Sequence, residues 1–110
     1  MHPIWLLSYL FAGAFAANAT PHVVSGITGR PFQSPFAKPP GKGLSSATVN
    51  VLWGFLNAVV AYLLVARVGV FNPRAVGHIL AFGLGALFIS LVSARHFGRF
   101  HGGSAPSRIG

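Results

Sequence analysis

The stretch Ala47–Ala66 reads ATVNVLWGFLNAVVAYLLVA and contains no acidic, basic or histidine side chain. An α-helix rises about 1.5 Å per residue, so a stretch of this length reaches about 30 Å, the thickness of the hydrocarbon core of a bilayer. Ser45 or Ser46 can cap its first turn, because a serine hydroxyl accepts a hydrogen bond from a free backbone N–H group. We therefore predict a transmembrane helix over residues 47–66.

The side chains of this helix divide into two faces. At about 100° per residue, one face carries small and amide residues, and the other carries large apolar residues. The first face consists of Asn50, Gly54, Asn57 and Ala61, and the second of Leu52, Phe55, Leu56, Val59 and Leu63. An amide in hydrocarbon needs a hydrogen-bond partner, so we expect both amides to bond to a neighbouring helix in this chain or in a second copy. Two interpretations stay open, helix packing or the polar lining of a pore.

A third helix is predicted over residues 73–94. Asn72 can serve as its N-cap, and Pro73 suits the first helical position. The preceding link, residues 67–74, is so short that it predicts a tight antiparallel hairpin of the second and third helices.

Small residues recur along the third helix. One ridge consists of Gly77, Ala81 and Gly85, and a second face of Gly83, Ala86 and Ser90. Small residues let another helix backbone approach closely, so Gly85→Leu is expected to disrupt packing or assembly. If one face serves the hairpin, the other is available for the first helix or for a second copy of the chain.

The apolar segment 3–20 is predicted to be a first transmembrane helix that ends at Pro21, because proline cannot continue a helix. A cleaved signal peptide is the alternative, since Ala17-Asn18-Ala19 fits the small-x-small cleavage pattern. No Lys or Arg precedes the apolar segment, which favours the uncleaved helix. The predicted fold is thus an all-α membrane protein, a single domain over residues 1–110 with three transmembrane helices.

Residues 21–46 change character abruptly and are predicted to be a long loop rich in Pro and Gly. Two aromatic rings recur among basic residues, and the candidate interaction residues are Arg30, Phe32, Phe36, Lys38 and Lys42. The loop either binds a partner or lies in the headgroup layer, or it is only a solvated linker. The tail, residues 95–110, is basic and is predicted to be partly disordered.

The whole chain has eight Lys or Arg residues and no Asp or Glu, which gives a formal net charge of +8. The counter-charge must come from anionic lipid headgroups, a partner protein or solvent ions, and we expect the loop and the tail to associate with anionic lipid or an acidic partner. Nucleic acid is not expected, because the basic residues are scattered beside apolar spans.

Missing residue types exclude several kinds of chemistry. Without carboxylates or cysteines, the chain cannot supply a catalytic triad, a carboxylate pair, a thiolate or an intramembrane carboxylate relay. The five histidines do not form a metal-ligand pattern, and we predict no metal, no cofactor and no enzymatic activity.

The basic residues also predict an orientation. Arg67 and Arg74 lie on the N-terminal side of the membrane in a three-span topology. Six cations lie on the other side: Arg30, Lys38, Lys42, Arg95, Arg99 and Arg108. We expect a protein of the cytoplasmic (inner) membrane, and the positive-inside rule predicts that its N-terminus lies outside and its loop and C-terminus lie in the cytoplasm.

Two functions follow from this plan. The first is a structural or accessory subunit that packs against itself or against a larger membrane complex. The second is a channel-forming homo-oligomer, since three spans with an outside N-terminus and a basic tail are similar to the plan of class I phage holins. No residue motif carries that similarity, which lies at the level of architecture alone.

Overall fold

The structure is a computed structural model that describes residues 2–103. These residues form three helices, α1 (Pro3–Ile27), α2 (Ala47–Ala66) and α3 (Val76–His101). Two short strands, β1 (Phe32–Gln33) and β2 (Leu44–Ser45), pair antiparallel between α1 and α2. The described part of the chain is therefore predominantly helical, as predicted.

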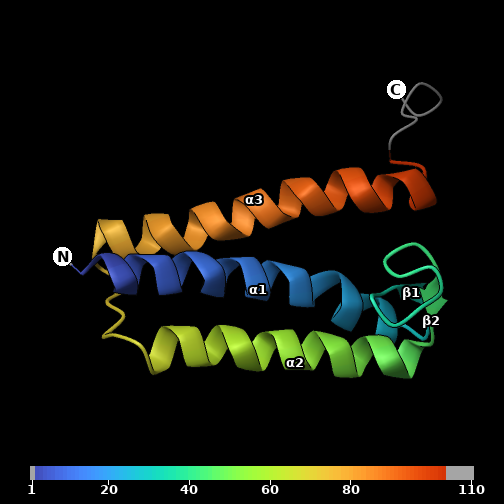
Figure 1. Ribbon diagram of the computed structural model, residues 1–110, viewed down its shortest axis with the longest axis horizontal. Coiled ribbons are helices and arrows are strands. Elements are labelled where there is room, and N and C mark those ends of the chain that lie inside the picture. The colour runs from blue at the N-terminus through green and yellow to red at the C-terminus, as the bar shows by residue number, and fades with distance from the viewer. Residues whose placement is uncertain (1, 104–110) are drawn as a thin grey trace.

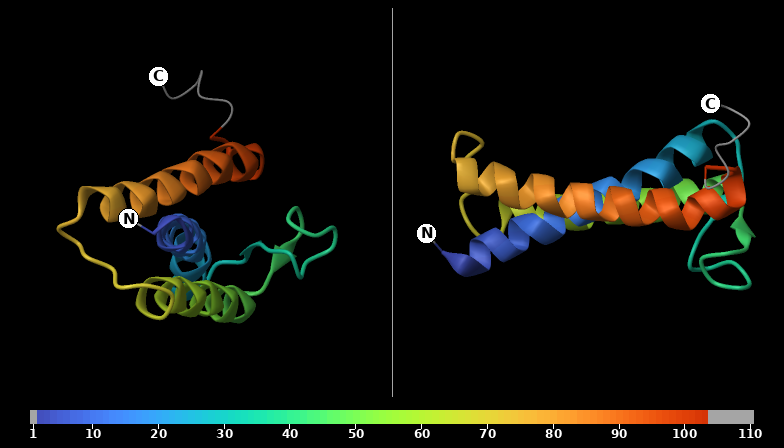
Figure 2. Two further views of the ribbon diagram at one scale, coloured as in Figure 1. Left: turned by 60° about the vertical axis from the view of Figure 1, so that its left-hand side comes forward. Right: turned by 90° about the horizontal axis from the view of Figure 1, so that it is seen from above.

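Helix α1 is the central element of the molecule. It packs against α2 on one side and α3 on the other, whereas α2 and α3 have almost no contact with each other (Figure 1). The N-terminus of α1 lies at the same end as the link between α2 and α3, and the β1–β2 loop lies at the opposite end (Figures 1 and 2). The predicted packing of the second and third helices as a tight hairpin is wrong. They run antiparallel, but α1 separates them.

Helix α2 has the predicted bounds. Its N-cap is Ser46, whose hydroxyl accepts a hydrogen bond from the Val49 N–H at 3.2 Å. The residues predicted on its small and amide face are its buried residues, Asn50, Gly54, Asn57 and Ala61. The residues predicted on its large apolar face are all exposed. The helical period alone therefore decided which side of α2 points inward.

Helix α1 continues through Pro21, so the predicted end at Thr20 is wrong. A proline inside a helix costs about 3 kcal/mol, since a backbone hydrogen bond is lost. The last turns are held by contacts with α2. An added Cβ at Gly26 would lie 2.6 Å from the Ala47 carbonyl oxygen, so this part of α1 lies directly against the α2 backbone. Tertiary packing thus outweighs the local preference of the proline, and the loop begins at residue 28 instead of 21.

Helix α3 differs from the prediction at both ends. Asn72 and Pro73 do not start it, because the Asn72 side chain accepts a hydrogen bond from the Arg74 N–H and forms a turn. The helix begins at Val76 instead and runs seven residues beyond Ala94, to His101. Gly102, at φ 84°, ends it in the left-handed conformation typical of a helix C-terminus. Of the predicted tail, residues 95–101 are therefore helical, and residues 104–110 lie outside the described residues.

Two of the helices, α2 and α3, are long and apolar enough to cross a membrane, with mean hydropathies of 1.9 and 2.0. Only 22% of the apolar window in α2 and 6% of that in α3 is buried, whereas the core helix of a soluble protein is mostly buried. Large apolar side chains such as Leu52, Phe55, Phe88 and Leu91 point outward. This distribution agrees with a membrane environment. Helix α1 does not belong to this apolar pair, and its membrane crossing stays a prediction.

Candidate functional site

Polar side chains of α1 and α2 meet inside the molecule. The Asn18 Nδ2 donates a hydrogen bond to the Asn57 Oδ1 at 3.0 Å, and the Asn57 Nδ2 donates to the Trp53 carbonyl oxygen at 2.8 Å. Nearer the N-terminus of α1, the Ser8 hydroxyl donates to the Leu64 carbonyl oxygen at 2.6 Å. The prediction that the Asn57 amide bonds to a neighbouring helix is confirmed, and the partner lies within the chain.

Asn50 and His22 form the centre of a second polar cluster. Both are buried, with 0% and 2% of their surfaces exposed. The Asn50 Nδ2 lies 3.0–3.2 Å from the carbonyl oxygens of Phe32, Ser45 and Ser46, so it joins the start of α2 to both strands. With the amide nitrogen engaged in this way, the Asn50 Oδ1 accepts a hydrogen bond from the His22 Nδ1–H at 2.7 Å.

That hydrogen bond sets the tautomer of His22. In a neutral imidazole one nitrogen carries the proton and the other a lone pair, so Nε2 is a hydrogen-bond acceptor. No residue within 2–103 donates to Nε2, since the side-chain hydrogen bond that His22 makes there uses Nδ1. The ring is surrounded by aromatic side chains, with ring centroids at 5.5 Å for Phe32, 6.4 Å for Trp53 and 6.1 Å for Phe97.

The loop is also bonded to the last turns of α3. The His96 Nε2–H donates to the Gly41 carbonyl oxygen at 2.6 Å, and His101 Nε2 lies 2.7 Å from Gln33 Oε1. The His101 ring stacks on Phe32, with 5.0 Å between centroids and 11° between planes. The loop is therefore ordered by contacts with all three helices, and it is not a free linker.

Helices α1 and α3 contact each other through glycines. A Cβ added at Gly85 would lie 1.8 Å from the Leu10 carbonyl oxygen, and one added at Gly13 would lie 1.9 Å from the Phe82 carbonyl oxygen. Both distances are far shorter than a van der Waals contact. Gly85 is buried, while Gly77 and Ala81 are partly covered. The predicted ridge of α3 thus packs within the chain at Gly85. On the second predicted face, Gly83 is exposed, and a Cβ added there would meet no atom within 4 Å outside its own stretch of helix.

The candidate loop residues have different surroundings. Phe32 is half-buried in the aromatic cluster, whereas Phe36 is 62% exposed and rests edge-on against Trp53. The predicted cations of the loop, Arg30, Lys38 and Lys42, are all exposed. Their proposed role in contacting lipid or a partner stays a prediction.

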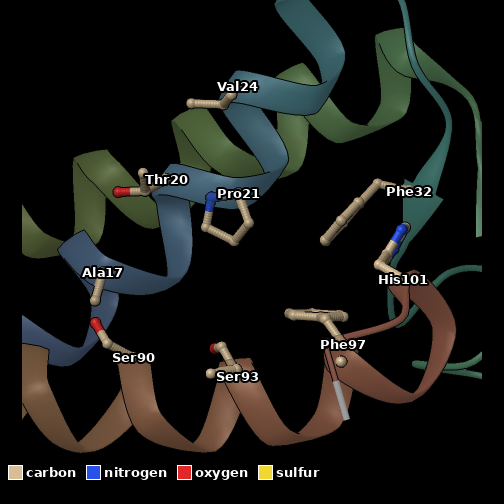
Figure 3. A pocket seen from close by; sticks show the side chains of 12 residues that line it. Ala17, Thr20, Pro21, Val24, Phe32, Ser90, Ser93, Phe97 and His101 are labelled. Atoms are coloured by element: carbon tan, nitrogen blue, oxygen red, sulfur yellow. The ribbon is translucent and has the colours of Figure 1, made fainter. Parts of the chain in front are cut away.

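Cavities of different character lie along α1. A wedge of about 580 Å³ opens between α1 and α3, and Thr20, Pro21, Ser90, Ser93 and Phe97 line it, with the Phe32–His101 stack at one end (Figure 3). On a different side of α1, two adjoining hollows form a largely apolar groove. The first is lined by Phe11, Ala14, Phe15 and Ile89 together with the amides Asn18 and Asn57. The second lies between α1 and α3 and is lined by Leu10, Phe11, Ala14, Leu84, Gly85, Phe88 and Ile89. A polar pocket of about 370 Å³ lies beneath the loop and includes Asn18, His22, Gln33, Ser34, Trp53 and His96.

Asn18 and His22 were not predicted as site residues. They lie four positions apart on α1 and face α2, and this spacing places two residues on the same side of a helix. The pairing could not be recognised from the sequence, because the predicted helix ended before His22. No group of three or more potential metal ligands occurs within residues 2–103.

Comparisons with protein-family models, with curated proteins and with solved structures find no match for this chain.

Proposed function

We propose that the chain is an integral membrane protein with three spans, α1 included, and a structural or accessory role. The observation that carries this proposal is the uncompensated charge at the loop end. Five described cations lie there, Arg30, Lys38, Lys42, Arg95 and Arg99; all are exposed, and the chain has no carboxylate side chain. Anionic headgroups or an acidic partner would balance these cations at a membrane surface, where solvent ions would otherwise do so.

The proposed topology has the N-terminus outside and the loop in the cytoplasm, at the inner membrane. The support is the unequal charge of the two ends, because the cations at the opposite end among residues 2–103 are Arg67 and Arg74. Helix α3 is about 39 Å long, which exceeds a hydrocarbon core of about 30 Å. Its last turns, with Arg95 and Arg99, would then extend into the headgroup layer.

The orientation can be tested with introduced cysteines, since the chain has none of its own. Val70→Cys lies in the α2–α3 link and Thr28→Cys at the loop end, and neither change alters the charge. We expect a membrane-impermeant maleimide to label Val70→Cys in intact cells and Thr28→Cys only after the membrane is permeabilised. The reverse pattern, or labelling of both in intact cells, would contradict the topology.

The accessory role can be tested by native mass spectrometry of the protein extracted gently from its own membrane. A fixed partner or a defined homo-oligomer is the expected result. A monomer that carries only lipid would refute association as its role.

The channel alternative expects Asn50 and Asn57 to line a polar path. Both amides are buried and hydrogen-bonded between α1, α2 and the loop, which favours the packing role. Dye leakage from vesicles at high protein density would restore the channel to first place.

A further inference from the structure

The polar pocket and the apolar groove are neighbours along α1. Asn18 lines both of them. From Asn18 the groove follows α1 to Leu10, which corresponds to about 12 Å of helix. A polar pocket beside a long apolar groove matches a molecule with a polar head and a single apolar tail.

The groove is open because of the flat order of the helices. With α1 between α2 and α3, one face of α1 is left uncovered, and Leu7 and Phe11 on that face are 49% and 50% exposed. In a bilayer this face is open to the lipid phase, so an apolar molecule can enter from the side.

The polar end offers hydrogen-bond acceptors. His22 Nε2 carries a lone pair, because Nδ1 donates to Asn50. His96 Nδ1 also carries a lone pair, because its Nε2–H donates to the Gly41 carbonyl oxygen. The Asn18 Oδ1 has no hydrogen-bond partner among the described residues, since that side chain bonds through Nδ2. A head group that fits this pocket must therefore donate hydrogen bonds.

The same pocket has no charged lining. No Lys or Arg lines it, and Trp53 and Phe97 provide aromatic surface. A phosphate head would be left without a cation there, which disfavours an anionic phospholipid. A flat, neutral, hydroxylated ring fits both the acceptors and the aromatic walls.

From this geometry, we propose that the pocket and groove along α1 bind a neutral hydroquinone that carries a single apolar tail, with its ring hydroxyl donating to His22 Nε2 beneath the loop and its tail in the groove beside Ala14. This proposal concerns binding alone.

The test is a titration of the purified protein in detergent with a decyl-substituted hydroquinone under argon. Trp53 lines the polar pocket, and its fluorescence can be isolated in a Trp5→Phe background, because the chain has two tryptophans. We expect saturable quenching. The dimethyl ether of the same probe should bind about tenfold more weakly, because it cannot donate a hydrogen bond to His22 Nε2. Equal binding of the ether would overturn the proposal. This comparison uses two ligands with the same protein, so no residue of the cavity is mutated.

Two matched variants locate the tail. Ala14→Phe fills the apolar groove, and Ala17→Phe fills the wedge between α1 and α3. We expect Ala14→Phe to weaken binding about tenfold and Ala17→Phe to leave it unchanged, provided that both variants keep the unfolding temperature of the parent. Loss of binding in Ala17→Phe alone would place the probe in the wedge and overturn the assignment.

A competition experiment tests the head group. Phosphatidylglycerol added in equal amount should not displace the probe, and displacement would overturn the preference for a neutral head. The titration uses the isolated chain, so its outcome is independent of whether a partner protein is found.

Discussion

The two sides of α1 are held by different interactions. Toward α2, the interface contains hydrogen bonds from Ser8, Asn18 and His22. Toward α3, no side-chain hydrogen bond joins the two helices within residues 2–103, and glycines bring the backbones together. In a membrane, lipid tails are as apolar as the side chains, so helices associate through close packing or through polar bonds. Among the described residues, the contact with α3 relies on close packing, whereas the contact with α2 combines hydrogen bonds with close packing at Gly26 and Gly54.

The two interfaces should respond differently to added volume and to lost hydrogen bonds. Added volume should be most harmful at the glycine contacts with α3. Lost hydrogen bonds should matter only at the contact with α2. Three variants test this contrast, in order of decreasing expected effect.

Gly85→Leu should have the largest effect. A Cβ at this position would lie 1.8 Å from the Leu10 carbonyl oxygen, which belongs to the backbone of α1 and cannot move aside. We expect a loss of about 3 kcal/mol of unfolding free energy, measured by denaturation in detergent micelles. The matched control is Gly83→Leu on the same helix, where no atom lies within 4 Å, and its stability should not fall. Equal stability of the two variants would refute close packing at Gly85.

Asn50→Leu should have an intermediate effect. The change leaves the buried His22 Nδ1–H without its acceptor and removes the donor to three loop carbonyl groups. We expect a loss of about 2 kcal/mol, because unsatisfied buried groups keep their desolvation cost. A double-mutant cycle with His22→Phe gives the check: the double variant should lose less than the sum of the single losses. Strict additivity would show that the two side chains are not coupled.

Asn57→Leu should have the smallest effect, about 1 kcal/mol, because it removes one interhelical bond. The Asn18 amide lies in a partly exposed position and can turn toward the groove. The combined variant with Asn18→Leu should recover part of the loss in the same denaturation assay. A large increase in vesicle permeability to ions would instead indicate that these amides line a conducting path.

Some candidate site residues could be predicted from spacing alone. Asn50 and Asn57 lie two turns apart, so the helical period was enough to assign them to the buried side of α2. Asn18 and His22 could not be paired with them, since their helix had to be continued through Pro21. The preference of a proline is local, and the contacts that outweigh it come from a helix more than twenty residues later in the chain.

The sequence by itself determined the apolar helices, the inward face of α2 and its serine cap. These features depend on residue type, helical period and hydrogen bonds between near neighbours. Only the tertiary structure decided that α1 lies between α2 and α3, that α1 continues to Ile27, and that the loop docks on the end of α3. A short link sets the direction of two helices but not whether they touch. Their positions depend on which surfaces fit, and the glycine contacts and amide bonds of α1 satisfy both neighbours at once.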